Sequence, residues 1–279
     1  MPERHHLKEE RTCPMTTPIE FAAANESTDT ETSPWTQPRK STYEDLILKT
    51  EYAERQLRFA VGQNWMRIVP ALASSVHGWM LPLHVLNFEG GRFCHPRTLK
   101  RNAKSVYDHA YAWAKEHAPE GLYSKTNKSG IRLLTDPMCV FWTLIEQDGK
   151  QVARLVVASG YDGSRGGAPG LGWKIWQHCR ERDETGKLIA DVTGEEAGVL
   201  ICVEKNQPKG AQYPSYTLRL GRQPRPMADL LAQMDAEEIA SLRPLEEVAR
   251  ELTEEEQWAC LARTMAPETV KLIRASLNR

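Results

Sequence analysis

The feature that most constrains the fold is a β-hairpin signal near the middle of the chain. Residues 140–160 read VFWTLIEQDGKQVARLVVASG, two runs rich in β-branched and aromatic residues that meet around Asp148-Gly149. An Asp-Gly pair between two such runs favours a tight hairpin turn, because both turn positions need or tolerate positive φ. The pattern therefore predicts two antiparallel strands here.

Four further segments are also typical of strands, since they combine aromatic and β-branched residues between prolines and glycines. They are NWMRIVP at 64–70, GWMLPLHVL at 78–86, GVLICVEK at 198–205 and YPSYTLRL at 213–220. Apolar residues at helical spacing predict a helix at 104–117. Five or six strands with one or two inserted helices indicate a small barrel. An OB-like barrel is the commonest such fold that binds extended nucleic acid.

The two ends of the chain differ from this β-rich centre. The first 38 residues are rich in Thr, Ser, Pro and Glu, and we expect them to form a disordered arm. A short helix should follow Ser41, which forms a capping box with Glu44. From Met227 onward the sequence is acidic and helical, either a tail or a small subdomain. The predicted divisions are 1–38, 39–60, a mostly β core at 61–226, and 227–279.

The net charge of −1 hides a strong partition along the chain. Residues 1–60 carry 8 Lys and Arg against 11 Asp and Glu, and residues 227–279 carry 6 against 11. Between them, residues 61–226 carry 22 against 15, a net charge of +7. A basic centre between acidic ends is typical of a protein that binds a polyanion, and the ends can compete for the same surface.

The sequence also bears on where the protein works. No apolar run approaches the roughly 20 residues that span a bilayer. The N-terminal residues MPERHHLKEERT lack the apolar core of a signal peptide. The six cysteines include no CxxC pair, which indicates free thiols. We therefore expect a cytoplasmic protein without a membrane partner.

Motifs of common enzyme classes are absent from the sequence. It contains no G-x-x-x-x-G-K-[ST], no H-E-x-x-H and no G-x-S-x-G. The glycine-rich stretch at 160–173 is either a mobile loop or a flap that brings Arg165 and Trp173 to a phosphodiester chain. We expect no catalytic residues and no enzyme. A nuclease whose carboxylates meet only in space remains the alternative, and a binder would act in the presence of chelator whereas a nuclease would not.

The basic centre interleaves cations with aromatic residues, the combination that holds single-stranded nucleic acid. Strand alternation puts Trp65 and Arg67 on one face, which favours the surface for Trp65. The alternative for each aromatic residue is the barrel core, which we expect for Trp142. The candidate DNA-binding residues are Trp65, Arg67, Arg92, Phe93, Lys104, Tyr107, Tyr111, Arg165, Trp173, Lys174, Trp176, Tyr216 and Arg219.

Three stretches occur in an order that is characteristic of one family. They are RKST at 39–42, RIVP at 67–70 and the hairpin with a proline-rich exit at 191–227. Over about residues 39–230, the chain thereby resembles the single-stranded DNA-binding (helix-destabilising) proteins of T4-type bacteriophages. The resemblance implies a sequence-independent single-stranded DNA-binding protein of replication or recombination that performs no chemistry. An RNA-binding or partner-recruiting module is a further alternative.

The resemblance also implies partners. In that family the basic-Ser/Thr peptide docks on the neighbouring subunit, although here the motif follows 38 further residues. The acidic C-terminal region of the family recruits replication partners and restrains DNA binding. Cutting after Met227 should therefore tighten binding, unless the acidic segment packs as a true subdomain. The self-association residues implied are Arg39, Lys40, Ser41 and Thr42.

Zinc is the one cofactor to consider. T4-type members carry a His and three Cys, including a CxxC pair, in the insert of the barrel. The same region here offers His84, Cys94, His95 and His109 without such a pair. Adjacent residues such as Cys94 and His95 seldom bind one ion together. We therefore expect no cofactor, with structural zinc as the alternative.

Overall fold

The computed structural model describes residues 43–100, 103, 105–117, 135–164, 166–211 and 213–277. All of them belong to one compact unit, Thr42–Arg279. The N-terminal arm expected at 1–38 lies outside the described residues. The same holds for Arg39, Lys40, Ser41, Thr42, Lys104 and Arg165.

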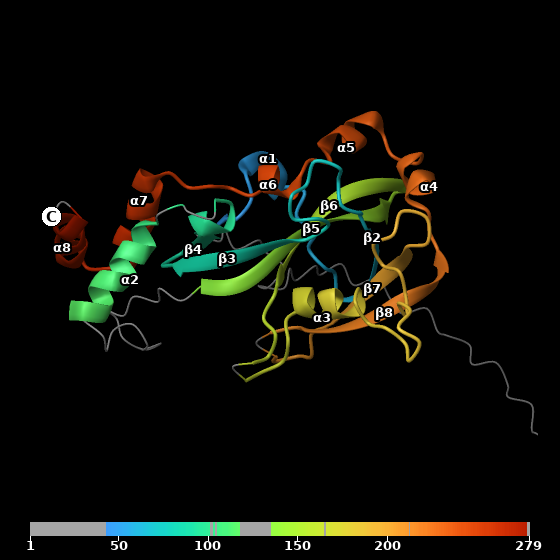
Figure 1. Cartoon of the computed structure of the whole chain (residues 1–279), viewed down its shortest axis with the longest axis horizontal. Coiled ribbons are helices and arrows are strands. Elements are labelled where there is room, and N and C mark those ends of the chain that lie inside the picture. Colours follow the sequence, from blue (N-terminus) through green and yellow to red (C-terminus); the bar gives the residue numbers. More distant parts are fainter. Residues whose placement is uncertain are drawn as a thin grey trace, which may run out of the picture. The chain divides into compact units, whose positions relative to one another are not determined.

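The described part of the chain is built on one mixed, eight-stranded sheet (Figure 1). The strands are β1 (Glu44–Leu46), β2 (Gly62–Ile68), β3 (Leu81–Phe88), β4 (Gly91–Cys94), β5 (Thr135–Gln147), β6 (Lys150–Ser159), β7 (Val199–Asn206) and β8 (Ser215–Pro224). Their order is β1-β4-β3-β5-β2-β7-β8, with β6 paired to β5. The β1–β4 pair is parallel, and the other pairs among the described strands are antiparallel.

The β5–β6 hairpin confirms the strongest signal in the sequence. Its register runs without a break from Met138↔Ser159 to Gln147↔Lys150. Asp148 and Gly149 have φ values of 53° and 76°, as the tight turn requires. The opposite edge of β5 is divided, because β3 pairs with its first half and β2 pairs near Leu144.

The sheet does not close into a barrel within the described residues. The five strands β6-β5-β2-β7-β8 follow one another, and no hydrogen-bonded pairing joins β6 to β8. Helix α3 (Leu171–His178) follows β6 and packs against both β6 and β8. Its Ile175 is fully buried in an apolar cluster with residues of β2, β5, β6 and β7. The fold is thus mostly β with an open sheet, and a closed OB-like barrel is not confirmed.

The remaining helices are short. They are α1 (Thr50–Ala53), a 3₁₀ turn at Pro96–Thr98, α2 (Val106–His117), α4 (Met227–Leu231), α5 (Ala236–Ser241), α6 (Leu245–Val248), α7 (Glu254–Thr264) and α8 (Pro267–Leu277). Helix α2 confirms the helix predicted at 104–117. Among the residues that the structure describes, none of the helices combines the length and apolar character of a membrane span.

The helix predicted directly after Ser41 is wrong in its start. Glu44 lies in strand β1 and not in a first helical turn, so it cannot complete a capping box. Its backbone N–H donates to the Gly90 carbonyl, and its carboxylate pairs with Arg263 of α7. The helix begins only at Thr50. Long-range pairing with β4 outweighs the local helical signal here.

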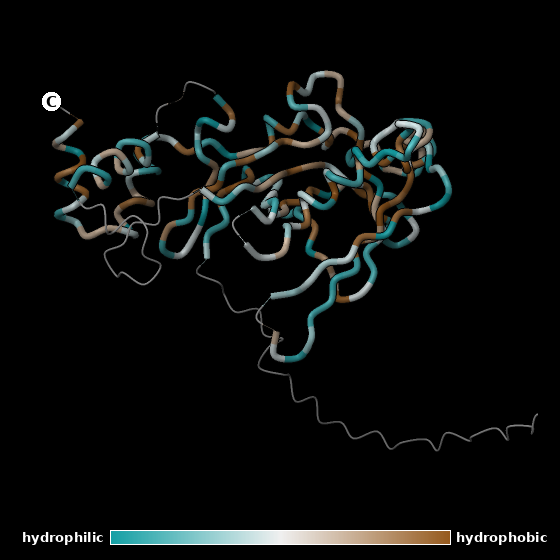
Figure 2. The backbone as a smooth tube through the Cα atoms, turned by 60° about the horizontal axis from the view of Figure 1, so that its bottom comes forward, coloured by the Kyte–Doolittle hydropathy of each residue, from teal (hydrophilic) through white to brown (hydrophobic). Residues whose placement is uncertain are grey.

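The acidic C-terminal segment packs into the core. Apolar residues (brown in Figure 2) line the strands, and α4 and α6 cover one face of β5 and β6. Leu230 and Val248 pack there around Trp142, which is buried as predicted. Trp258 of α7 and Ile273 of α8 join a second cluster with α2, β3 and β4. Of the two alternatives for this segment, packing as a true part of the fold is the one the structure bears out.

Candidate functional site

A cleft of about 750 Å³ lies where β6 and β8 fail to pair. It is lined by the end of β6, the start of α3, the start of β8 and residues 57–59. We call it the seam cleft. Its walls combine three cationic with three aromatic side chains: Arg58, Lys174, Lys205, Phe59, Tyr213 and Tyr216.

Two cations of the seam cleft, Lys174 and Lys205, are held in place without being neutralised. The Lys174 Nζ donates to the Tyr216 carbonyl at 3.0 Å, and the Lys205 Nζ donates to the Phe59 carbonyl at 3.0 Å. An ammonium group has three donors, so each lysine keeps donors for a ligand. No carboxylate among the described residues lies within ion-pair distance of Lys174, Lys205 or Arg58. The cleft therefore presents net positive charge.

The aromatic rings of the cleft come from both of its sides. Phe59 and Tyr216 meet edge to face, with ring centroids 6.0 Å apart. Burial raises the pKa of Tyr216, so its phenol stays neutral at physiological pH. Tyr213, in the loop between β7 and β8, is 74% exposed. An exposed ring at the mouth of a cationic cleft offers a face on which a planar group can stack.

Helix α3 carries a second aromatic feature beside the cleft. Trp173 and Trp176 lie three residues apart and stack with ring centroids 4.8 Å apart. The Arg180 guanidinium lies 4.5 Å from the centre of the Trp176 ring, a cation–π contact. The helix packs closely on the sheet because Gly172 has no side chain. A Cβ at this position would collide with the Cys139 thiol of β5. The glycine-rich stretch thus ends as the start of a packed helix.

Four of the predicted binding residues come together at this place. Trp173, Lys174 and Trp176 lie on α3, and Tyr216 lies opposite them on β8. Trp65 is 45% exposed, as predicted, because it faces away from the apolar cluster that contains its neighbour Met66. The register places it on one face with Cys202 and Arg219, and Arg219 pairs with Glu204 at 2.7 Å.

The prediction for Arg67 is corrected by its burial. Its side chain is 0% exposed, and the guanidinium donates to the carbonyls of Ile68 at 2.6 Å, Val192 at 2.7 Å, Arg225 at 3.2 Å and Gly194. Burial lowers the pKa of this guanidinium, and nearby Asp191 partly offsets that effect. Arg67 fastens the segment before β7 and the exit of β8 to β2. It cannot reach a nucleic acid.

Phe93 and Tyr107 are core residues and are likewise corrected. Both are buried in the cluster beneath α2, where their rings meet edge to face at 5.1 Å. Tyr111 is half-buried against the same cluster. Arg92 forms an ion pair with Asp45 of β1. These residues lie on the elements around α2 and do not line the seam cleft.

The four zinc candidates do not form one site. The buried Cys94 thiol donates to the Ile47 carbonyl, and burial raises the pKa of the thiol to about 12. The His95 Nε2 lies 3.4 Å from Asp108, and its Nδ1 accepts from the Arg97 backbone. His84 lies exposed on β3, and His109 lies on α2. Within the described ranges, no group of three or more His, Cys, Asp or Glu could hold a metal ion.

The sequence reasoning missed four residues of the cleft. Arg58, Phe59 and Tyr213 lie in irregular segments, and Lys205 lies near the end of β7. The only available signal was the group of Lys and Tyr residues around the turn NQPKGAQ. The sequence does not indicate that residues 57–59 lie against this group, so the cleft could not be predicted from it.

Comparison with known proteins finds no family model that matches this chain and no curated protein with significant similarity to it. The resemblance to the T4-type family therefore stays a prediction.

Proposed function

We propose that the chain binds single-stranded DNA without sequence preference, in replication or recombination, and that the seam cleft and α3 hold the strand. One observation carries the proposal: three uncompensated cations and three aromatic rings line one cleft of the described structure. Cations that follow the phosphates and rings that stack on bases are the two components of single-strand binding. The stacked pair Trp173 and Trp176 extends the aromatic surface along α3.

We infer that the five strands β6-β5-β2-β7-β8 correspond to an OB-type barrel whose seam is left open. An OB fold is a five-stranded, partly open barrel, and its second and third strands commonly form the binding face. The corresponding hairpin here is β5–β6. Its outward face is covered by α4 and α6, since Val140, Trp142 and Leu155 pack against them.

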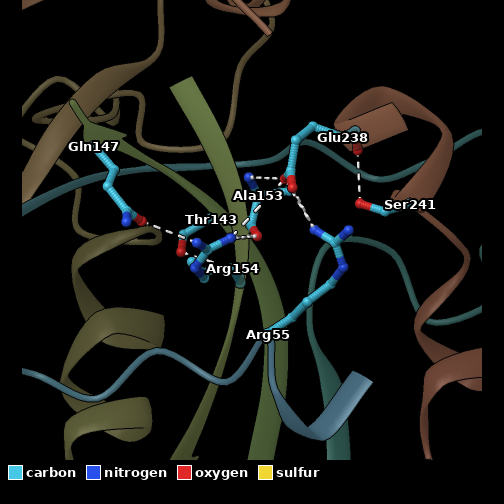
Figure 3. A network of polar contacts seen from close by, with 7 residues as sticks. All are labelled: Arg55, Thr143, Gln147, Ala153, Arg154, Glu238 and Ser241. Carbon is cyan, nitrogen blue, oxygen red and sulfur yellow. Dashed lines mark hydrogen bonds and ion pairs between the residues drawn. The ribbon is translucent and has the colours of Figure 1, made fainter. Parts of the chain in front are cut away.

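Polar contacts also hold α5 and Arg243 against this hairpin, and those of Glu238 are drawn in Figure 3. Glu238 of α5 accepts from the Ala153 backbone at 3.0 Å and pairs with Arg55 at 2.9 Å. The Trp142 Nε1 donates to the Arg243 carbonyl at 2.8 Å. A strand bound to this protein would therefore use the seam side of the barrel and not the outer face of the hairpin.

The salt dependence of binding tests the proposal. Each phosphate contact of a single strand contributes about 0.7 to the slope of log K against log salt. Three cations predict a slope of about −2 from the seam cleft alone. We expect labelled oligo(dT) to bind more tightly than a duplex in fluorescence anisotropy, with RNA of equal length as a third arm. Equal affinity for the duplex, or binding that salt does not weaken, would refute single-strand binding.

Variants locate the site. Lys174→Gln and Lys205→Gln should each reduce the magnitude of the slope by about 0.7 and weaken binding. Lys271→Gln is the matched control, because Lys271 is exposed on α8 and pairs with Glu268. If the control lowers affinity as much as the cleft variants, the charge effect is general and the cleft is not the site.

A further inference from the structure

A second cavity, of about 450 Å³, borders α3. It lies between that helix, the start of β3 and the first half of β5. Three indole rings line it, with Met138 and two imidazoles. We call it the tryptophan pocket, after Trp79, Trp173 and Trp176.

The lining of the tryptophan pocket selects for a neutral, flat group. No Lys, Arg, Asp or Glu belongs to the described residues that line it. Indole faces favour planar aromatic ligands, and the imidazoles of His77 and His84 offer a few hydrogen bonds. The volume lies within the range of pockets for small molecules. A nucleobase has this combination of shape, neutrality and polar edges.

A third groove on α3 shares one lining residue with the pocket and one with the seam cleft. Trp176 lines both the tryptophan pocket and a groove that contains Lys174 and Arg180. Lys174 in turn also lines the seam cleft. Helix α3 thus separates a cationic cleft from a neutral aromatic pocket by about one helix diameter, roughly 10 Å.

The walls of the pocket are fixed before any ligand arrives. Glu246 of α6 accepts from the backbone N–H groups of Val76 and His77, both at 2.9 Å. Trp79 meets the buried Phe141 edge to face at 5.7 Å. A preformed pocket loses little conformational freedom on binding.

We propose that the tryptophan pocket takes one base of the strand whose phosphates lie in the seam cleft. This inference rests on the proposed single-strand binding. The strand crosses α3 with a phosphate near Lys174 and turns one base onto Trp173, because the Trp176 ring already contacts Trp173 and Arg180. The subsite recognises the base as a neutral aromatic ring, whatever its sequence context.

Blocking the pocket separates base binding from phosphate binding. Gly160 lines the pocket, and a Cβ placed there would meet its nearest atom, the Met138 carbonyl oxygen, at an ordinary 3.4 Å. Gly160→Leu should therefore fold and narrow the pocket. Thr217→Leu, on an exposed position of β8, is the matched control.

The two probes are an oligo(dT) of about 12 nucleotides, within the site size of an OB fold, and an abasic oligomer of equal length. Gly160→Leu should weaken binding of oligo(dT) about tenfold, the scale of one stacked base, and leave the abasic oligomer unchanged. Lys174→Gln should weaken both. Thr217→Leu should change neither.

Three outcomes would overturn the inference. If Gly160→Leu weakens binding of both probes, the pocket takes no base although the cleft binds the strand. The same conclusion follows if Gly160→Leu weakens binding of neither probe while Lys174→Gln weakens binding of both. If the wild-type chain binds neither probe, the proposed function itself fails. Should Gly160→Leu lower the melting temperature strongly, Trp173→Ala decides in its place, because it removes a half-exposed stacking face and is subject to the same two-probe criterion.

Discussion

Replacing Arg67 with Met tests the structural role of its side chain. The guanidinium is fully buried and donates to four backbone carbonyls on three separate segments. Hydrogen bonds that involve a charged group contribute about 1.5–3 kcal/mol each. Replacing Arg67 with Met removes all four hydrogen bonds and leaves the carbonyls of Val192 and Gly194 without these donors. It also removes the unfavourable free energy of burying the cation, which offsets part of the loss.

The free energy of unfolding should fall by about 3–5 kcal/mol, the range for breaking a buried charged interaction. For a chain of this size, about 2–4 °C of melting temperature corresponds to each kcal/mol, so the midpoint should fall by about 6–20 °C. Differential scanning fluorimetry with urea unfolding measures the loss. Arg67→Lys keeps the charge but has fewer donors and should fall in between.

Arg219→Met is the control, because Arg219 is exposed and its pair with Glu204 contributes about 0–1 kcal/mol. A folded Arg67→Met variant with the wild-type melting temperature and weakened oligo(dT) binding would refute the structural role. It would restore Arg67 as a DNA contact.

Three further predictions concern the same framework. Gly198→Ala should lower the melting temperature, because a Cβ at 198 would collide with the Arg67 guanidinium, whereas Gly160→Ala should not; equal midpoints would contradict this. Cutting after Met227 should abolish cooperative thermal unfolding or lower its midpoint, because Leu230, Leu245 and Val248 cover Trp142; a truncation with an unchanged midpoint would contradict it. Burial tends to raise the pKa of Glu246, but hydrogen bonds from backbone N–H groups, including those of Val76 and His77, outweigh it and lower the pKa. The stability that the Glu246 carboxylate contributes should be present above its ordinary pKa of 4.5 and lost as the pH falls through the lowered value. The melting temperature of Glu246→Gln should therefore fall less than that of the wild type between these two pH values. An identical fall would exclude this role.

Local turn chemistry explains which parts of the fold could be predicted. The β5–β6 hairpin follows from Asp148-Gly149, and the β7–β8 hairpin from a turn-rich connection. Strand β1 could not be foreseen, because its stability comes from pairing with β4, whose residues lie 47 positions further along. The helical signal around Glu44 was real but weaker than that pairing.

The candidate site was predictable only on one helix. Trp173, Lys174 and Trp176 are adjacent in sequence, so their clustering is visible there. Residues Phe59 and Tyr216 meet only because the open seam brings distant segments together. Strand alternation assigned Arg67 to the face of Trp65, but alternation does not tell which loop covers that face.

The charge partition along the chain has a second meaning in the folded structure. Acidic residues of both ends pair with cations of the centre, as in Asp45–Arg92, Glu251–Lys100 and Asp235–Lys150. Part of the central +7 is therefore neutralised by the fold. Among the described residues 61–226, the cations without a carboxylate partner, apart from buried Arg67 and from Lys115, are Lys174, Arg180, Arg182, Lys187, Lys205, Lys209, Arg222 and Arg225.

These eight cations share one stretch of the chain, residues 174–225, from α3 to the end of β8. Phosphates are attracted to charge that remains after internal pairing, and among the described residues of the centre this stretch holds most of the unpaired cations. Lys174 and Lys205 of this stretch line the seam cleft, and Arg180 lies on Trp176 beside it. Charge reversal at Asp235, which pairs with Lys150 on the covered side, should leave oligo(dT) affinity nearly unchanged at moderate salt, because salt screens interactions between exposed charges beyond about 10 Å. A large gain in affinity for Asp235→Lys would instead show that the acidic helices compete with the strand directly.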